Sequence, residues 1–226
     1  MIRFERVTKD HGGGARPALR DVTFAIDAGE MLFVTGHSGA GKSTLLRLIA
    51  LEERATRGTI TLDGTHLEKV RWRGVPAVRR RLGLVFQDHR LLLDRTVFDN
   101  VALPLVIAGT RRAEIEGRVR AALDRVGLLD RARSQPLALS GGEQQRVGIA
   151  RAIVAKPALI LADEPTGNLD PQLSVEIFNL FGALSQTGTT ILIASHDLHL
   201  IQRMRRRVLV LDHGALIDDY RPERPQ

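Results

Sequence analysis

A glycine-rich turn ending in Lys-Ser stands between a short apolar run and a segment with helical periodicity. The turn, residues 36–44, reads GHSGAGKST and matches G-x-x-x-x-G-K-S/T at each fixed position. The apolar run 31–35 before it predicts a strand, and Leu45, Leu48 and Ile49 after it predict one face of a helix. This order of strand, tight loop and helix predicts an α/β fold.

The residue types in this turn are those that hold phosphate groups. Glycines let the backbone turn its N–H groups inward without Cβ clashes, and the start of the following helix adds positive charge. Lys42 supplies a point charge for the β- and γ-phosphates, and the Ser43 hydroxyl suits Mg²⁺. An exposed Gly/Ser loop is the alternative, which the flanking strand and helix disfavour. We therefore predict a nucleoside triphosphate site formed by Gly36, Ser38, Gly39, Ala40, Gly41, Lys42, Ser43 and Thr44.

The composition limits the class of protein. A chain of 226 residues can bury a sizeable core as one domain. It has no cysteine, which excludes disulfides, thiolate metal sites and cysteine nucleophiles. No apolar stretch approaches the roughly 20 residues that span a bilayer, and residues 1–5 lack a signal-peptide pattern. We expect a cytoplasmic protein.

The charge is strongly basic, and arginine supplies most of it. There are 33 basic and 26 acidic residues, for a net charge of +7. Arginines cluster at positions 71/73, 79–81, 111–112 and 203–207. We interpret these clusters first as solvated faces, next as contacts with an anionic lipid surface, and only third as nucleic-acid contacts.

Two kinds of strand pattern occur along the chain. Residues 2–7 and 19–26 alternate apolar and polar side chains around a three-glycine turn, which predicts an antiparallel pair. The runs 158–162, 190–194 and 208–211 are apolar on both faces, which indicates a buried, mostly parallel sheet covered by helices. We expect a single domain with a core of about residues 1–87 and 139–219, an inserted helical subdomain at about 88–138, and a flexible tail at 220–226. Within the helical subdomain, one helix face before Gly127 is formed by Ile115, Val119, Ala122 and Val126.

Polar side chains follow the predicted strands at the edge where the glycine-rich turn lies. Asp163 and Glu164 end one strand, His196 follows another, and Gln87 follows a shorter run at 83–86. Chemistry in open parallel sheets collects at the carboxyl ends of the strands. Asp163, with Ser43 and Gln87, is predicted to hold Mg²⁺; Glu164 is predicted to polarise water, with His196 at the γ-phosphate.

A second Gly-rich segment, residues 139–145, begins a helix. Ser140 and Glu143 have the spacing of a capping box, and Gly141 and Gly142 leave the helix N-terminus bare, as suits an anion. A well-capped helix without further function is the alternative. One phosphate loop needs no second phosphate site, so we predict a head-to-tail dimer in which each cap completes the partner's site.

Together these residues resemble the ATP-binding subunits of ABC transporters. The resemblance covers nearly the whole chain and assigns Gln87 to the Q-loop, 139–144 to the signature, Asn168-Leu169-Asp170 to the D-loop and His196 to the H-loop. It implies a P-loop NTPase core with an antiparallel β subdomain and an inserted α-helical subdomain. It implies ATP and Mg²⁺, catalysis by Glu164, His196, Gln87 and Lys42, and coupling of the two sites by Asp170.

Two positions depart from the pattern of that family. His11 stands where an aromatic residue usually stacks on adenine, and imidazole offers less stacking area. Leu51-Glu52-Glu53 lacks the glycine commonly found after the P-loop helix, which we expect to affect local packing.

Within ABC proteins, several stretches are similar to the FtsE family of bacterial cell-division ATPases. They are residues 1–5, 36–41, 86–89, 94–97 and 99–105. The resemblance implies an ATP-dependent homodimer on the cytoplasmic face of the inner membrane, bound to an FtsX-like integral membrane protein. There, ATP turnover signals to septal peptidoglycan hydrolases.

Three alternatives stay open at the level of the sequence. One is the nucleotide-binding subunit of a lipoprotein-release or macrolide-export transporter. Another is a nucleic-acid-associated ATPase, which one Trp and one Tyr support poorly because stacking residues are scarce. The third is a scaffold that binds ATP with little turnover.

Overall fold

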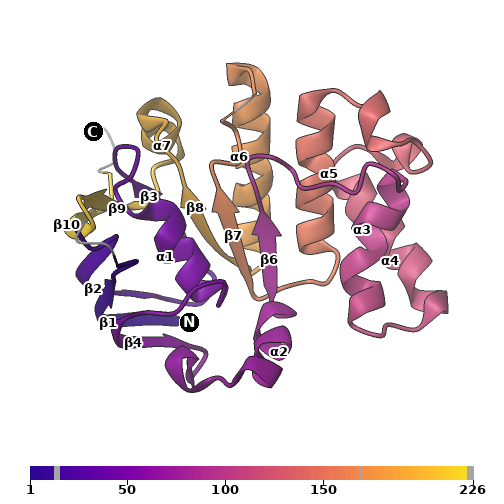
Figure 1. Cartoon of the computed structure of the whole chain (residues 1–226). Helices are drawn as coiled ribbons and strands as arrows, with labels where there is room; N and C mark the ends of the chain where they lie inside the picture. Colours follow the sequence, from indigo (N-terminus) through magenta and orange to yellow (C-terminus); the bar gives the residue numbers. More distant parts are fainter. Residues whose placement is uncertain (13–15, 168, 223–226) are drawn as a thin grey trace.

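A mostly parallel β-sheet forms the centre of the molecule. In the computed structural model, which describes residues 1–12, 16–167 and 169–222, six strands lie in the order β10-β9-β3-β8-β7-β6 (Figure 1). All neighbours are parallel except the pair β9 and β10. The strands are β3 (Met31–Thr35), β6 (Leu82–Val85), β7 (Leu159–Asp163), β8 (Thr190–Ala194), β9 (Arg207–Asp212) and β10 (Ala215–Tyr220).

A smaller antiparallel sheet packs beside it. Among the described residues its strands are β1 (Ile2–Lys9), β2 (Leu19–Ile26), β4 (Arg57–Leu62) and β5 (Thr65–His66), in the order β2-β1-β4-β5. Buried and exposed residues alternate along β1 and β2 with one break in each strand, and the rings of Phe4 and Phe24 stack across the pair at 4.6 Å. The predicted antiparallel pair is therefore confirmed, while Gly13 and Gly14 of the predicted turn lie outside the described residues.

Helices cover both faces of the central sheet. They are α1 (Lys42–Ile49), α2 (Val75–Arg79), α3 (Val97–Ile107), α4 (Arg112–Arg125), α5 (Gly141–Ile153), α6 (Pro171–Gln186) and α7 (Leu198–Met204). Strand β3 shows why both faces need cover: Leu32 and Val34 join the core that contains α1 and the small sheet. Met31 and Phe33 face the other core, where Phe33 meets Phe178 of α6 edge to face at 5.5 Å. A strand buried on both sides has to be apolar throughout, as the sequence pattern indicated.

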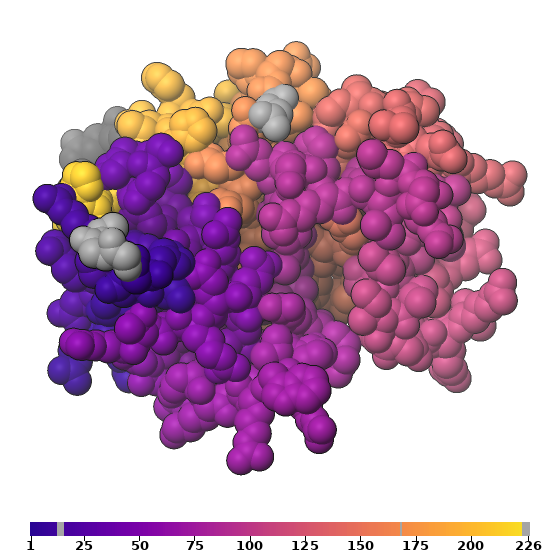
Figure 2. Space-filling model, viewed as in Figure 1, coloured from indigo at the N-terminus to yellow at the C-terminus, as the bar shows by residue number. Residues whose placement is uncertain are grey.

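Helices α3 and α4 form the part of the molecule that follows β6, and they pack with α5 at the right of Figures 1 and 2. Thr96 and Asp99 form a capping box at the start of α3. Val119 and Ala122 are buried on the predicted face of α4, and Gly127, at φ 67°, ends the turn after it. The predicted helix face is confirmed, and the division of the chain into a core and a helical subdomain stays a prediction.

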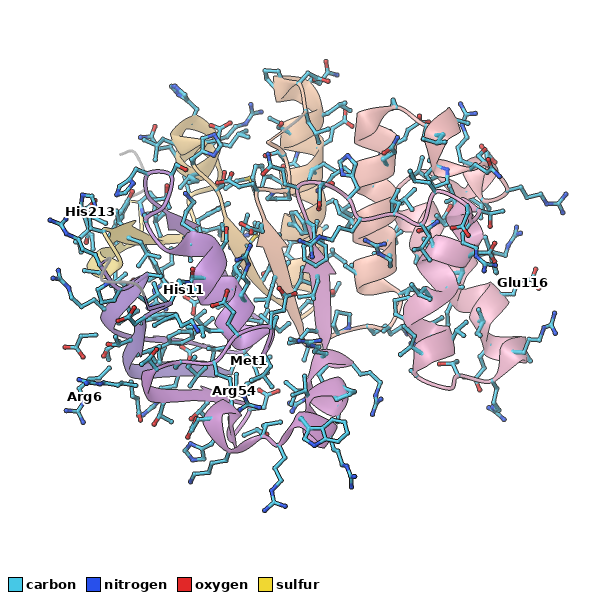
Figure 3. The ribbon with its side chains drawn as sticks, in the orientation of Figure 1. Met1, Arg6, His11, Arg54, Glu116 and His213 are labelled. Carbon is cyan, nitrogen blue, oxygen red and sulfur yellow. The ribbon has the colours of Figure 1, made fainter. Side chains whose placement is uncertain are left out.

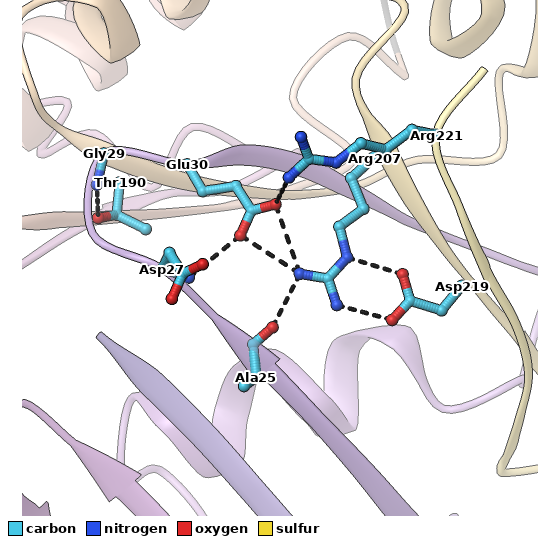
Figure 4. Close-up of polar contacts among 8 residues, drawn as sticks. All are labelled: Ala25, Asp27, Gly29, Glu30, Thr190, Arg207, Asp219 and Arg221. Carbon is cyan, nitrogen blue, oxygen red and sulfur yellow. Dashed lines mark hydrogen bonds and ion pairs between the residues drawn. The ribbon is translucent and has the colours of Figure 1, made fainter. Parts of the chain in front are cut away.

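Arg207 ties the two sheets together (Figure 4). From β9 its guanidinium makes a bidentate contact with Asp219 of β10, at 2.7 and 2.6 Å, and donates to the carbonyl of Ala25 in β2 at 2.8 Å. It also contacts Glu30 at 3.3 Å, and Glu30 accepts a further hydrogen bond from Arg221. Hydrogen bonding to Asp219 raises the pKa of Arg207, so the guanidinium stays charged in this cluster.

Some residues of the arginine clusters are structural, so the interpretation of these clusters as solvated faces is wrong for them. Arg207 keeps only 16% of its side-chain surface exposed. Arg79 donates to the carbonyls of Ala50 and Leu51 after α1. Arg71 and Arg73 do face solvent, on either side of the exposed Trp72.

The segment after α1 forms its turn without a glycine. Leu51 takes a left-handed conformation with φ 53°, which a non-glycine residue adopts at a cost of about 1 kcal/mol. Its side chain is buried, which offsets that cost. Glu53 then lies among Lys9, His11 and Arg47, at 3.4 to 3.5 Å. The departure has a local structural effect, as the sequence led us to expect.

Candidate nucleotide site

A cavity of about 580 Å³ lies over the loop that joins β3 to α1. Its walls come from this loop and from residues that follow the carboxyl ends of β6, β7 and β8. The lining residues are Ala18, His37, Ser38, Gly39, Gly41, Lys42, Ser43, Thr44, Gln87, Glu164 and His196. Residues that were far apart in the sequence therefore meet at one edge of the sheet.

The loop needs glycine at two points because the backbone passes close to other strands. At Gly36, φ is 146° and a Cβ would lie 2.1 Å from the carbonyl oxygen of Leu211. At Gly41, φ is 109° and a Cβ would lie 2.5 Å from the carbonyl oxygen of Ala18. No side chain fits at either position without moving backbone, so these glycines fix the path of the loop.

Lys42 lies along the inner side of this loop with 8% of its surface exposed. Its Nζ donates to the carbonyls of Gly36 at 2.7 Å and His37 at 3.2 Å, and lies 3.8 Å from Oε1 of Glu164. The ammonium is thus fixed at the cavity wall by backbone groups that carry no net charge. A positive charge held in this way is available to a phosphate anion.

Ser43, which lines the cavity, and Asp163, which lies just behind it, form an oxygen-rich corner. The Ser43 hydroxyl donates to Oδ1 of Asp163 at 3.1 Å. Burial raises the pKa of Asp163, and the hydrogen bond from Ser43 opposes that rise. A hydroxyl and a half-buried carboxylate are hard oxygen donors and fit Mg²⁺. The side chain of Gln87 lies against Gly167, where a Cβ would come 2.9 Å from its Nε2.

Glu164 and His196 form a contact at the ends of two neighbouring strands. Nδ1 of His196 lies 2.9 Å from Oε2 of Glu164, and the backbone N–H of His196 donates to the same oxygen at 3.4 Å. Glu164 has φ 46°, and its own N–H donates to Ala194 of β8. The carboxylate therefore stands between the ammonium of Lys42 and the imidazole, where a base acting on water at the cavity would stand.

The cap of α5 has the predicted form and lies outside the cavity of its own chain. The Ser140 hydroxyl accepts from the N–H of Glu143, and the Glu143 carboxylate accepts from the N–H of Ser140 at 2.8 Å. The hydrogen bond from the Ser140 backbone lowers the pKa of Glu143. The residues that line the 580 Å³ cavity include none of the segment 139–144, all of which the structure describes. Within one chain, the cap does not contribute to the phosphate cavity.

Two other predicted site residues have structural contacts. Oδ1 of Asp170 accepts from the N–H groups of Gln172 and Leu173 and caps α6. His11 is exposed, with Nδ1 at 3.5 Å from Glu53. Asn168, which the resemblance places in the D-loop, lies outside the described residues.

The cavity also includes residues that the sequence did not predict. His37 is a variable position of the loop motif, and Ala18 precedes β2 in a segment without functional pattern. A second hollow of about 900 Å³ shares Glu164 and His196 with the first and continues along the start of α6, past His199 of α7. This hollow adjoins the site because it lies next to the carboxyl ends of β7 and β8. Sequence spacing does not specify that position.

A phosphate-holding loop, an oxygen-rich corner and a paired carboxylate at one sheet edge define the class of P-loop ATPases. The chain belongs to the ABC transporter family, which matches residues 19–167, and within it to the FtsE group of cell-division ATP-binding proteins. It is 57% identical to FtsE of Escherichia coli K12 over 96% of this chain and 97% of that protein. It is 48% identical to FtsE of Mycobacterium tuberculosis over 97% of this chain and 95% of that protein.

Solved structures agree with this assignment. The dimeric ABC transporter cassette MJ0796 superposes with a TM-score of 0.90 at 33% identity, over 99% of both chains. Its post-hydrolysis form, bound to ADP and phosphate, gives the same TM-score at 32% identity. The predicted α/β fold class, the ABC and FtsE resemblance and the ATPase activity are confirmed. In the part of the chain that the structure describes, no helix has the length and apolarity to cross a bilayer.

Proposed function

We propose that this ATPase hydrolyses ATP in a site shared by two copies of the chain, and that it powers a cell-division complex at the cytoplasmic face of the bacterial inner membrane. The observation that carries the shared site is the position of the α5 cap. Ser140 and Gly141 are exposed, and a Cβ on Gly141 would meet nothing within 4 Å. A bare helix start that lies outside its own chain's phosphate cavity is free to approach a partner's γ-phosphate.

In this proposal, each side chain at the cavity has one role. Lys42 and the loop N–H groups bind the β- and γ-phosphates, and the Ser43 hydroxyl, Asp163 and Gln87 hold Mg²⁺. The metal ion would neutralise charge on the phosphate oxygens. Glu164 takes the proton of the attacking water, and His196 holds the carboxylate in position through the 2.9 Å contact. Catalysis rests on positioning and on charge stabilisation, as phosphoryl transfer generally requires.

The partner's contribution completes the arrangement. Ser140 and Gly142 of the second copy reach the γ-phosphate, and Asp170, at the start of α6, links the two sites. Gly142 packs so closely on Leu173 that a Cβ would lie 2.7 Å from its Cδ1, so the start of α5 contacts the start of α6. A change at one site is thereby passed to the other through packed helix ends.

The membrane partner is proposed from the names of the relatives. The similar proteins from Escherichia coli and Mycobacterium tuberculosis are named cell division ATP-binding proteins, which favours division over lipoprotein release or macrolide export. We assign an FtsX-like integral membrane protein as the partner, with the segment after Gln87 and helices α3 and α4 as the transmitting surface. Affinity purification from solubilised membranes, followed by identification of the companion protein, tests this assignment.

The shared site is tested by the oligomeric state of three variants. Glu164→Gln keeps the shape of the side chain but removes the base, so ATP should bind and hold the protein as a dimer in sedimentation. Adding Ser140→Arg should return it to a monomer that still binds ATP. The control Ala113→Arg adds the same side chain to the exposed start of α4 and should leave the dimer intact. A normal ATP dimer in the Ser140→Arg background would refute the shared site.

A further inference from the structure

Three side chains with metal-binding atoms meet beside the phosphate loop. His37 belongs to that loop, Asp212 ends β9, and His213, labelled at the left of Figure 3, begins the turn to β10. Nε2 of His37 lies 3.1 Å from Oδ1 of Asp212, and Nε2 of His213 lies 3.9 Å from the same oxygen. One ligand atom from each of the three residues lies within 4.8 Å of the other two. Neither the ABC motifs nor the catalytic roles above use Asp212 or His213.

The hydrogen bonds of His37 identify which ring nitrogen is free. Its Nδ1 lies 2.6 Å from the carbonyl oxygen of Ser38, which can only accept, so Nδ1 carries a proton. In the neutral ring Nε2 then carries a lone pair and no proton, and it faces a carboxylate oxygen of Asp212 at 3.1 Å. Two lone pairs at this distance repel each other unless a cation lies between them. A proton or a metal ion can fill that role, and the second imidazole next to the same oxygen favours a metal ion.

We propose that His37, Asp212 and His213 form a binding site for a transition-metal ion of the Zn²⁺ class. Two imidazole nitrogens and one carboxylate oxygen are typical ligands of Zn²⁺, while Mg²⁺ prefers oxygen alone. Zn²⁺ bonds of about 2.0–2.1 Å in a tetrahedron separate the ligand atoms by about 3.3 Å, between the 3.1 and 3.9 Å found here. The Nδ1 contact with the Ser38 carbonyl is the outer hydrogen bond that orients metal-binding histidines.

The backbone around the three residues is held in place before any ion binds. The N–H of Gly214 donates to the carbonyl of Ala40 at 3.1 Å, and the N–H of Arg20 donates to the carbonyl of Gly214 at 2.7 Å. Gly36 packs directly against Leu211. The side chains of His37, Asp212 and His213 are 45–60% exposed, so an ion can enter and a water can complete its shell. An ion here would brace the phosphate loop against the β9–β10 turn.

The site differs from the Mg²⁺ corner in its ligands, so the two are separable by experiment. Isothermal titration of the nucleotide-free protein with Zn²⁺ alone should show one ion per chain, and Mg²⁺ should not compete. His213→Ala and Asp212→Asn should each weaken Zn²⁺ binding at least about tenfold. His66→Ala removes an exposed imidazole elsewhere and serves as the matched control, and Asp163→Asn should leave Zn²⁺ affinity unchanged. All variants should keep the circular dichroism spectrum of the parent.

A second readout reports on the loop itself. Saturating Zn²⁺ should raise the melting temperature and slow amide exchange in the segment 36–40, and His213→Ala should abolish both effects. The proposal is overturned if Zn²⁺ does not bind, if His213→Ala binds it as the parent does, or if only Asp163→Asn loses it. Absence of Zn²⁺ binding would assign the cation between His37 and Asp212 to a proton.

Discussion

Replacing Arg207 with methionine tests whether the contact between the sheets carries stability. Methionine keeps most of the side-chain length but removes the hydrogen bonds to Asp219, Ala25 and Glu30. The carboxylate of Glu30, which is 10% exposed, then loses a donor away from water, at about 1–3 kcal/mol, whereas the carbonyl of the exposed Ala25 can bond to water instead. The carboxylate of Asp219, which is 36% exposed, can bond to water once Arg207 is replaced, so losing this ion pair destabilises the fold by about 1 kcal/mol at most.

The sum is smaller than these parts because Arg221 remains on Glu30 at 2.8 Å. We expect the free energy of unfolding to fall by about 2 kcal/mol. That loss lowers the melting temperature by about 4–8 °C for a chain of this size. Urea unfolding followed by circular dichroism measures it. Arg3→Met removes an ion pair with Glu5 that is more than half exposed and should change stability by less than about 0.5 kcal/mol. A loss for Arg207→Met no larger than that of Arg3→Met would refute the reasoning.

Three further predictions concern the nucleotide site and its supports. Gly36→Ala places a Cβ 2.1 Å from the Leu211 carbonyl and should lower the free energy of unfolding by about 2–4 kcal/mol and weaken ATP binding, measured by urea unfolding and calorimetry. Lys42→Ala should reduce ATP affinity by at least about a hundredfold in calorimetry, since it removes the only ammonium that lines the described cavity; undiminished affinity would contradict the assignment. Glu143→Gln should be less stable than the parent near neutral pH, and the difference should vanish as pH falls through the lowered pKa of Glu143, because protonation of the parent's carboxylate then leaves both proteins with a neutral side chain at this position; a pH-independent difference in urea unfolding would count against the cap.

The features that the sequence predicted well are those governed by local chemistry. The phosphate loop, the cap at Ser140 and the apolar strands each follow from a pattern within about ten residues. The meeting of Gln87, Glu164 and His196 at one cavity was also predictable, because the carboxyl ends of parallel strands share an edge.

The features that the sequence missed depend on contacts between distant segments. In the sequence, Arg207 is one of four arginines within residues 203–207, and only the pairing of β9 with β10 brings it to Asp219. His37 meets His213 because β3 and β9 are neighbours, which no local spacing specifies. Such long-range pairs are decided by strand order, and strand order follows from packing of the whole core.

The phosphate loop near the start of the chain rests on a turn made by its last strands. β9 pairs with β3, Leu211 fills the space beside Gly36, and the N–H of Gly214 holds the carbonyl of Ala40. A nascent polypeptide still emerging from the ribosome lacks these supports, although its glycine-rich loop was translated long before. Such an incomplete chain should therefore hydrolyse no ATP, and activity should begin only once translation has completed the hairpin of β9 and β10.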